Sequence, residues 1–182
     1  GGGREHALAW KCAQPPYIKK VFCAPGNAGT ALEQKVVNVP IEAENIIELA
    51  AFAEAENIDL TIVGPEGPLV MGIVDTFRVR GLLCFGPTKS AAILEGSKVF
   101  TKEFLSRHDI PTASYASFDD LDRALMHLKK VNFPVVVKAD GLAAGKGVFI
   151  SACLEEAERA VTEILRGGRF GAAGKEIVIE EF

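Results

Sequence analysis

The segment best suited to chemistry is a run of glycine and alanine that joins two apolar stretches. It extends from Lys138 to Val148. Glycines let successive N–H groups point at one anion, and lysines add compact positive charge for polyphosphate oxygens. The P-loop pattern is broken, because Gly147 follows the second lysine and a strand is expected next instead of a helix. A plain hairpin rarely needs so many small residues, so we interpret residues 141–147 as a phosphate-covering loop, with Gly141, Gly145, Lys146 and Gly147 as its contacts.

Other charged residues could complete such a site. Lys138 ends an apolar strand, where an ammonium is unfavourable unless an anion or a carboxylate compensates it. Lys98 could equally be an exposed helix lysine, and Lys102 has only a helix surface to explain it. The last three residues are either a strand edge with outward carboxylates or a strand whose backbone groups meet an adenine: Glu180, Glu181 and Phe182.

Three loops in the first half could hold a second ligand. Gly1-Gly2-Gly3-Arg4-Glu5-His6 precedes a helix, whose free N–H groups and dipole favour an anion. Pro25-Gly26-Asn27-Ala28-Gly29-Thr30 and Gly64-Pro65-Glu66-Gly67-Pro68 each follow a strand, where open parallel sheets bind ligands. Taken singly, the first could be a disordered end and the others tight turns. Together they predict a shared crevice.

The elements that must position these loops alternate between strands and helices. Such alternation predicts a parallel sheet covered on both faces. No strand precedes the first glycine loop, so we expect this sheet to lack a central strand. The expected strands are residues 21–24, 36–39, 60–63 and 82–85, and the expected helices are residues 4–12, 46–56 and 69–79.

The second half predicts two helices against an antiparallel sheet. Two linking helices come first, residues 89–94 and 97–108, the second capped by Ser97. We place the domain boundary at 94/95, with linker helices over 95–112 and a small ATP-binding lobe over 113–182. The remaining elements are a strand from residue 113 onward, strands 134–138, 148–151 and 177–182, and helices 121–131 and 154–165.

Composition excludes several classes of function. The 182 residues are 48% hydrophobic and 24% charged, as in a soluble globular protein. A net charge of −4 without a basic block argues against nucleic acid, and no apolar run approaches the ~20 residues that cross a membrane. We therefore expect a cytoplasmic protein. The four cysteines lack metal-ligand spacing and are expected in the core: Cys12, Cys23, Cys84 and Cys153.

These motifs, in this order, resemble the phosphoribosylamine–glycine ligases, or glycinamide ribonucleotide synthetases, a family of ATP-grasp enzymes. The resemblance covers essentially the whole chain. It implies an α/β fold with a Rossmann-like parallel-sheet N-terminal lobe and a partial ATP-grasp domain (α+β), truncated at both ends. The motifs that carry it are Gly2 to Leu8, Ala24 to Thr30, Asp59 to Glu66, Phe85 to Thr88, Leu94 to Lys98 and Val137 to Val148.

The resemblance also implies an activity in purine synthesis. Glycine would attack the γ-phosphate of ATP to form an acyl phosphate, and phosphoribosylamine would displace the phosphate. The loop 141–147 would close over ATP phosphates held by Lys98 and Lys138, and Glu180 to Phe182 would meet the adenine. Phosphoribosylamine would be held by Gly2, Gly3, Arg4, Glu5, His6, Pro25, Gly26, Asn27, Gly29, Thr30 and Glu66.

Some family features fall outside the segment. The first strand is missing, and the ligands for Mg²⁺ or Mn²⁺ are expected beyond Phe182, so no metal ligand is assigned here. The segment alone is therefore expected to be inactive. The alternatives are a noncatalytic nucleotide-binding module and another ATP-grasp ligase or carboxylase. The expected partners are the small molecules ATP, glycine and phosphoribosylamine, and a monomer is one option for the full-length protein.

Overall fold

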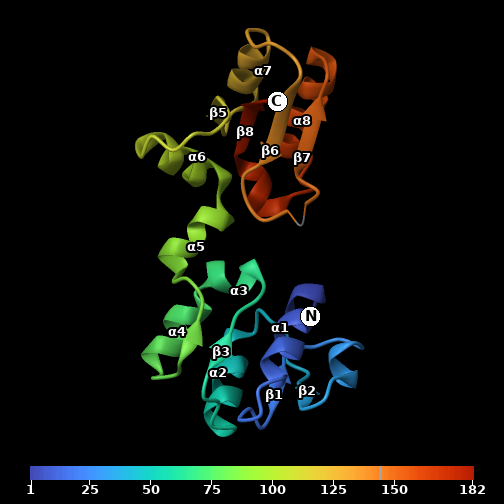
Figure 1. The fold of residues 1–182 in the computed structure, drawn as a ribbon. Helices are drawn as coiled ribbons and strands as arrows, with labels where there is room; N and C mark the ends of the chain where they lie inside the picture. Colours follow the sequence, from blue (N-terminus) through green and yellow to red (C-terminus); the bar gives the residue numbers. More distant parts are fainter. Residues whose placement is uncertain (144) are drawn as a thin grey trace. The chain divides into compact units, whose positions relative to one another are not determined.

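The computed structural model describes residues 1–143 and 145–182 and separates the chain into two compact units, Gly1–Ala92 and Ile93–Phe182 (Figure 1). Ala144 belongs to the predicted phosphate-covering loop and lies outside the described residues. The elements of the first unit are α1 Gly3–Ala13, β1 Val21–Cys23, η1 Thr30–Leu32, β2 Val36–Asn38, α2 Ile46–Ala55, β3 Thr61–Ile62, α3 Glu66–Met71, α4 Ile73–Val79 and β4 Cys84–Phe85.

The strands of the first unit form two separate parallel pairs instead of the single sheet expected. Strand β1 pairs with β2 in the register Val21 to Val36, and β3 pairs with β4 in the register Thr61 to Cys84. Within the described part of the chain, no strand joins the two pairs. A parallel sheet that lacks its central strand, as the sequence predicted, would consist of two such separate pairs.

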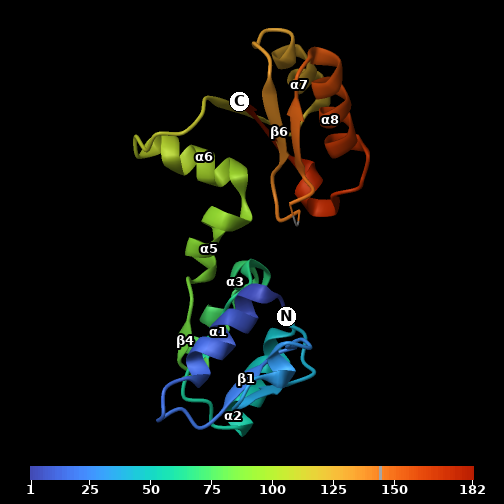
Figure 2. The same ribbon diagram turned by 45° about the vertical axis from the view of Figure 1, so that its right-hand side comes forward.

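Each pair has its own apolar packing. Helix α1 lies along β1 and β2 (Figure 2), where Ala9 packs on Cys23 and Val36. The other pair is covered by a larger cluster around the fully buried Phe77 of α4. Further members of that cluster are Ala50, Ala53, Ile73 and Val74.

A glycine interrupts the helix that the sequence predicts over residues 69–79. Gly72 has a φ of +98°, the left-handed conformation that glycine adopts without a Cβ penalty. Its N–H donates to the carbonyl groups of Pro68 and Leu69, which ends α3, and α4 begins at the next residue. The apolar periodicity continues across the break, so it could not indicate two helices.

The second unit is a four-stranded antiparallel sheet with two helices, as predicted. The strand order is β5-β8-β6-β7. Helices α7 and α8 contact each other and cover the sheet (Figure 1). The elements are α5 Lys89–Gly96, which spans the boundary between the units, α6 Lys98–Arg107, β5 Tyr115–Phe118, α7 Leu121–Leu128, β6 Val135–Ala139, β7 Val148–Ser151, α8 Leu154–Arg166, η2 Gly171–Lys175 and β8 Ile177–Glu181.

The two faces of this sheet differ in character. Val137 and Ile179 are buried in the core formed with α7 and α8. Because side chains alternate along a strand, Lys138 and Glu180 lie on the opposite face. Strand β8 is internal, between β5 and β6, so the interpretation of Glu180 as part of a strand edge is wrong.

The cysteines do not all lie in the core. Cys23 is buried, Cys12 and Cys84 are half-buried, and Cys153 is exposed at the N-cap of α8, so the expectation fails for Cys153. All four are free thiols. None of the helices among residues 1–143 and 145–182 is long and apolar enough to cross a membrane.

Candidate functional site

Asn27 joins the first two loops of the N-terminal unit. Its side-chain NH₂ donates to the carbonyl of Gly1 at 3.0 Å and approaches that of Gly2 at 3.4 Å. Its Oδ1 accepts from the N–H groups of Gly29 at 2.8 Å and Thr30 at 3.0 Å. The loop of residues 25–30 is therefore fixed against the start of α1.

A second asparagine supports this loop from β2. Asn38 Nδ2 donates to the carbonyl of Asn27 at 2.8 Å, and Asn38 Oδ1 lies 2.7 Å from the hydroxyl of the fully buried Thr30. A Cβ on Gly26, whose φ is +78°, would overlap the Asn38 side chain, so only glycine fits there. The sequence analysis did not assign Asn38; its position at the end of a strand that borders the loop is the signal that could have found it.

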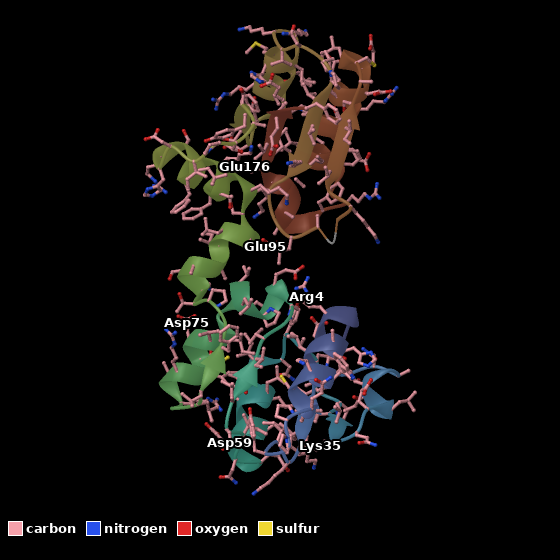
Figure 3. All side chains as sticks on the ribbon, viewed as in Figure 1. Arg4, Lys35, Asp59, Asp75, Glu95 and Glu176 are labelled. Atoms are coloured by element: carbon pink, nitrogen blue, oxygen red, sulfur yellow. The ribbon has the colours of Figure 1, made fainter. Side chains whose placement is uncertain are left out.

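Arg4 brings in the third loop (Figure 3). Its guanidinium donates to the carbonyl of Gly64 at 2.7 Å and lies 3.3 Å from the Glu66 carboxylate. Both side chains of this ion pair are largely exposed, at 63% and 42%. The structure thus brings together the three loops that the sequence predicted to share a crevice.

Glu5 and His6 fix the first turn of α1. Glu5 Oε2 accepts from the Gly2 N–H at 2.7 Å, which satisfies one of the free donors at the helix start. His6 Nε2 lies 2.8 Å from Glu33 Oε1, and the His6 ring fills the space in which a Cβ on Gly29 would stand. These contacts hold the Glu5 and His6 side chains in place, and Gly3 between them and the N-terminus is exposed.

The C-terminal unit gathers three charged residues on the sheet face opposite α7 and α8, which is open at β7 whereas Val178 of β8 is fully buried. Lys138 Nζ donates to Glu180 Oε2 at 2.8 Å, and Lys102 Nζ lies 3.5 Å from the same oxygen. The exposed fractions of the side chains are 25% for Lys138 and 9% each for Lys102 and Glu180. Lys102 is therefore not a surface lysine, and the expectation that placed it on the helix surface is wrong.

Lys98 is half-buried at the start of α6 and contacts the base of the glycine loop. Its Nζ donates to the carbonyls of Asp140 at 3.1 Å and Gly141 at 3.0 Å. Burial lowers the pKa of the Lys98 ammonium below its ordinary value, and Asp140 opposes that shift while Lys138 adds to it. The exposed-lysine alternative is excluded for Lys98.

Asp140 joins α6 to the end of β6. Its Oδ1 accepts from the Ser97 hydroxyl at 3.0 Å and the Val99 N–H at 2.8 Å. Ser97 in turn caps the helix by accepting from the Phe100 N–H, as predicted. Asp140 was not predicted to have a role, although it is the one acidic residue in the glycine-rich run of residues 138–148.

The described part of the glycine loop is closely packed at both ends. A Cβ on Gly141 would lie 2.8 Å from Ala173 Cβ, and one on Gly147 would lie 2.8 Å from Ala143 Cβ. Small residues are therefore required by the packing itself. Lys146 is exposed, and its N–H donates to the Ala143 carbonyl at 2.9 Å.

The open sheet face also offers apolar surface next to Lys138. Val148 and Ile150 of β7 are 44% and 65% exposed and pair in register with Lys138 and Val136. Phe182, the last residue, is 71% exposed. The alternation of β7 could have indicated Val148 and Ile150, but only the pairing places them beside the lysine. Glu181 accepts from the Ser114 hydroxyl at 3.0 Å.

The described residues do not provide a metal site. Among them, no group of three or more His, Cys, Asp or Glu side chains could hold a metal ion. Mg²⁺ or Mn²⁺ therefore does not fit the described residues alone.

Two family models match the chain in succession. The first describes the N domain of phosphoribosylglycinamide synthetase and matches residues 1–95, and the second describes its ATP-grasp (A) domain and matches residues 96–182. The curated phosphoribosylamine–glycine ligase of Pasteurella multocida is 64% identical over 181 residues, which cover 100% of this chain and 42% of that protein. The chain thus spans less than half the length of this relative.

Solved structures agree. The crystal structure of phosphoribosylamine–glycine ligase from Thermotoga maritima is 34% identical and has a TM-score of 0.79 over 100% of this chain and 42% of its own. Biotin carboxylase from Campylobacter jejuni, at 16% identity, has a TM-score of 0.77 over 100% of this chain and 44% of its own, and shares the fold alone. The chain belongs to the phosphoribosylglycinamide synthetase family, of which it carries an N domain followed by ATP-grasp sequence.

Proposed function

We propose that the full-length protein is an ATP-dependent ligase that joins glycine to 5-phosphoribosylamine and yields glycinamide ribonucleotide, in purine biosynthesis. The observation that carries this proposal is the family match over both units, together with relatives that bear the name of that ligase. We also keep the domain division at 94/95, a cytoplasmic location and small-molecule partners as parts of the proposal.

The open face of the second unit is our proposed ATP site. Lys98 and Lys138 supply ammoniums near the glycine loop, and such point charges suit phosphate oxygens. The apolar patch of Val148 and Ile150 offers a surface for the base. The residues proposed for ATP are Lys98, Lys138, Gly141, Gly145, Lys146, Gly147, Glu180, Glu181 and Phe182.

The three joined loops of the first unit are our proposed phosphoribosylamine site. Gly3, exposed at the start of α1, and the exposed Arg4 guanidinium supply N–H donors for a phosphate. Asn27 and Asn38 hold the loops in one geometry. The residues proposed are Gly2, Gly3, Arg4, Glu5, His6, Pro25, Gly26, Asn27, Gly29, Thr30 and Glu66.

The proposed reaction has two steps and needs no protein nucleophile. A glycine carboxylate oxygen attacks the γ-phosphorus of ATP, the bond to the β,γ-bridging oxygen breaks, and ADP leaves. The amine of phosphoribosylamine then attacks the glycyl carbon, inorganic phosphate leaves with the carboxylate oxygen, and the amine loses a proton. The chain contributes position and charge, which are the main terms in phosphoryl transfer. A divalent cation bound outside the described residues would neutralise phosphate charge.

Isotope transfer in the full-length protein tests the reaction. Glycine labelled with ¹⁸O in its carboxylate should place one label in the inorganic phosphate that is released. ADP formation over many turnovers should require both glycine and phosphoribosylamine. ATP binding without turnover would favour a noncatalytic nucleotide-binding module, and turnover with a different acid would favour another ATP-grasp ligase or carboxylase.

A further inference from the structure

Two lysine ammoniums share one buried carboxylate in the second unit. Glu180 Oε2 lies 2.8 Å from Lys138 Nζ and 3.5 Å from Lys102 Nζ. The three residues come from three elements: β8, β6 and α6. We call them the Glu180 triad. A helix and two strands thus converge on one oxygen.

The charge of the triad differs from that of a simple ion pair. Lys138 and Glu180 alone would sum to zero, and a buried, neutral pair attracts a polyphosphate weakly. With Lys102 the sum is +1. If the Lys138 ammonium turns toward a bound phosphate, the buried Glu180 carboxylate needs another cation, because an uncompensated buried charge is strongly destabilising. Lys102 supplies that cation.

The position of Lys102 restricts it to an indirect role. Its Nζ donates to the Thr112 hydroxyl at 2.6 Å and the Ala113 carbonyl at 3.2 Å, and it lies 5.5 Å from the centre of the Tyr115 ring. Its side chain is 9% exposed, whereas that of Lys138 is 25% exposed. Lys138 can therefore meet a ligand from solvent, and Lys102 remains beneath it.

We propose that Lys102 is a positioning residue that compensates the Glu180 carboxylate and thereby frees the Lys138 ammonium for nucleotide phosphate. This inference rests on the proposed function, in which Lys138 binds the phosphates of ATP. It assigns a purpose to a buried cation that the ligand does not touch. It also predicts that the charge of Lys102 matters only while Glu180 is a carboxylate.

The test uses variants of the full-length protein and two probes, ATP and adenosine, whose Kd values are measured by calorimetry and by displacement. Lys102→Met should weaken ATP binding about tenfold and adenosine binding less than twofold, because charge-assisted phosphate contacts are the ones lost. Lys102→Arg, which keeps the charge, should stay within about threefold of wild type for ATP. Lys129→Met, an exposed residue at the end of α7, is the control for the loss of one positive charge.

Rescue by a second substitution gives the decisive result. In Lys102→Met with Glu180→Gln there is no carboxylate to compensate, so the preference for ATP over adenosine should return to within about threefold of wild type. Additive losses in the double variant would overturn the proposal. Equal losses of ATP and adenosine binding in Lys102→Met would also overturn it, since that pattern indicates a general structural defect.

Three further outcomes remain distinguishable. If Lys102→Met does not fold, Glu180→Gln alone decides: its preference for ATP over adenosine should be kept or raised, and a fall would overturn the proposal. If wild-type protein fails to bind ATP, the proposed ATP site itself is wrong. ATP binding by wild type together with unchanged binding in Lys102→Met would refute only the role of Lys102.

Discussion

The two units organise their candidate sites by different physical means. In the first, neutral side chains such as Asn27, Thr30 and Asn38 tie loops together through short hydrogen bonds. In the second, the ammoniums of Lys138 and Lys102 are balanced by the carboxylate of Glu180, and the charge of Asp140 favours the ammonium of Lys98. The first arrangement depends on shape and donor direction, and the second depends on the number of charges.

This difference predicts different sensitivities. Hydrogen bonds to backbone groups lose strength when a donor or acceptor moves, but salt screens them little. Contacts between exposed charges weaken as ionic strength rises, with a Debye length of about 10 Å at 0.1 M. Ligand binding at the second unit should therefore respond to salt and charge substitutions. The loop structure that Asn27, Thr30 and Asn38 hold in the first unit should respond to changes in side-chain shape instead.

The largest effect is expected from Lys138→Ala in the full-length protein. Loss of one charge-assisted phosphate contact, worth about 1.5–3 kcal/mol, should weaken ATP binding about ten- to hundredfold. The loss of ATP affinity should exceed that in Lys102→Ala, because Lys102 is buried and acts on the ligand only through Glu180 and Lys138. Calorimetry at two salt concentrations measures both. Equal affinity in the two variants would remove the assignment of Lys138 to phosphate.

Thr30→Val tests whether hydrogen bonds between neutral side chains stabilise the loops of the first unit. The Thr30 hydroxyl accepts from the Asn27 N–H at 2.7 Å and lies 2.7 Å from Asn38 Oδ1; Thr30 is fully buried and the two asparagines are half-buried. Its removal leaves buried groups unpaired, so the free energy of unfolding should fall by about 1–3 kcal/mol. Urea unfolding followed by the fluorescence of Trp10, the only tryptophan of the chain, reports this unit.

Thr61→Val is the matched control. Thr61 lies in β3 and is half-buried, and its recorded hydrogen bond among the described residues is through its backbone N–H. The same change there should be close to neutral. A similar loss at both positions would mean that the hydrogen bonds around Asn27 do not set the stability of the loop.

Asp140→Ala probes the connection between helix α6 and the glycine loop. It removes the acceptor of the Ser97 hydroxyl and the Val99 N–H. We expect a loss of about 0.5–2 kcal/mol in stability, as for a helix cap, and weaker ATP binding because Lys98 shifts with the helix. Asp140→Asn keeps an oxygen acceptor and should lose less. Thermal unfolding and calorimetry distinguish the two, and identical behaviour of both variants would argue for a purely electrostatic role.

The smallest effect concerns Glu176, which is labelled in Figure 3. Burial raises the pKa of the Glu176 carboxyl above 4.5, and Asp140 and Asp119 raise it further. Between 4.5 and that raised value the folded chain binds more protons than the unfolded chain, so stability falls as pH rises. Glu176→Gln should therefore be slightly more stable than wild type at pH 7, with the difference gone below pH 4.5. Urea unfolding at both pH values measures it, and a less stable variant at pH 7 would contradict the expectation.

Local patterns predicted most of the fold. Alternating apolar runs located β6 and β7, and the cap at Ser97 marked the start of α6. The break at Gly72 was missed because glycine is tolerated inside helices and the periodicity continues on both sides. The pairing of strands could not be predicted, because it depends on contacts between segments far apart in the sequence.

The sequence indicated the loops of the two candidate sites but not the residues that support those loops. Glycine patterns at strand ends indicated the loops, because the backbone conformation they need is local. Asn38 and Lys102 act through contacts with residues in other elements. The sequence on either side of them gives no indication of these contacts. One clue was present: Lys98 and Lys102 are four residues apart, which places them on one face of a helix.

The internal position of β8 has a consequence for synthesis on the ribosome. During translation β6 can pair only with β7, and β5 has no neighbour, until residues 177–181 emerge. Pairing over such separations is slow and leaves strand edges unprotected in the meantime. Glu180 lies on β8 and is synthesised 42 residues after Lys138 of β6. A nascent chain that stops short of Glu180 would therefore present both an incomplete sheet and a lysine pair without its carboxylate.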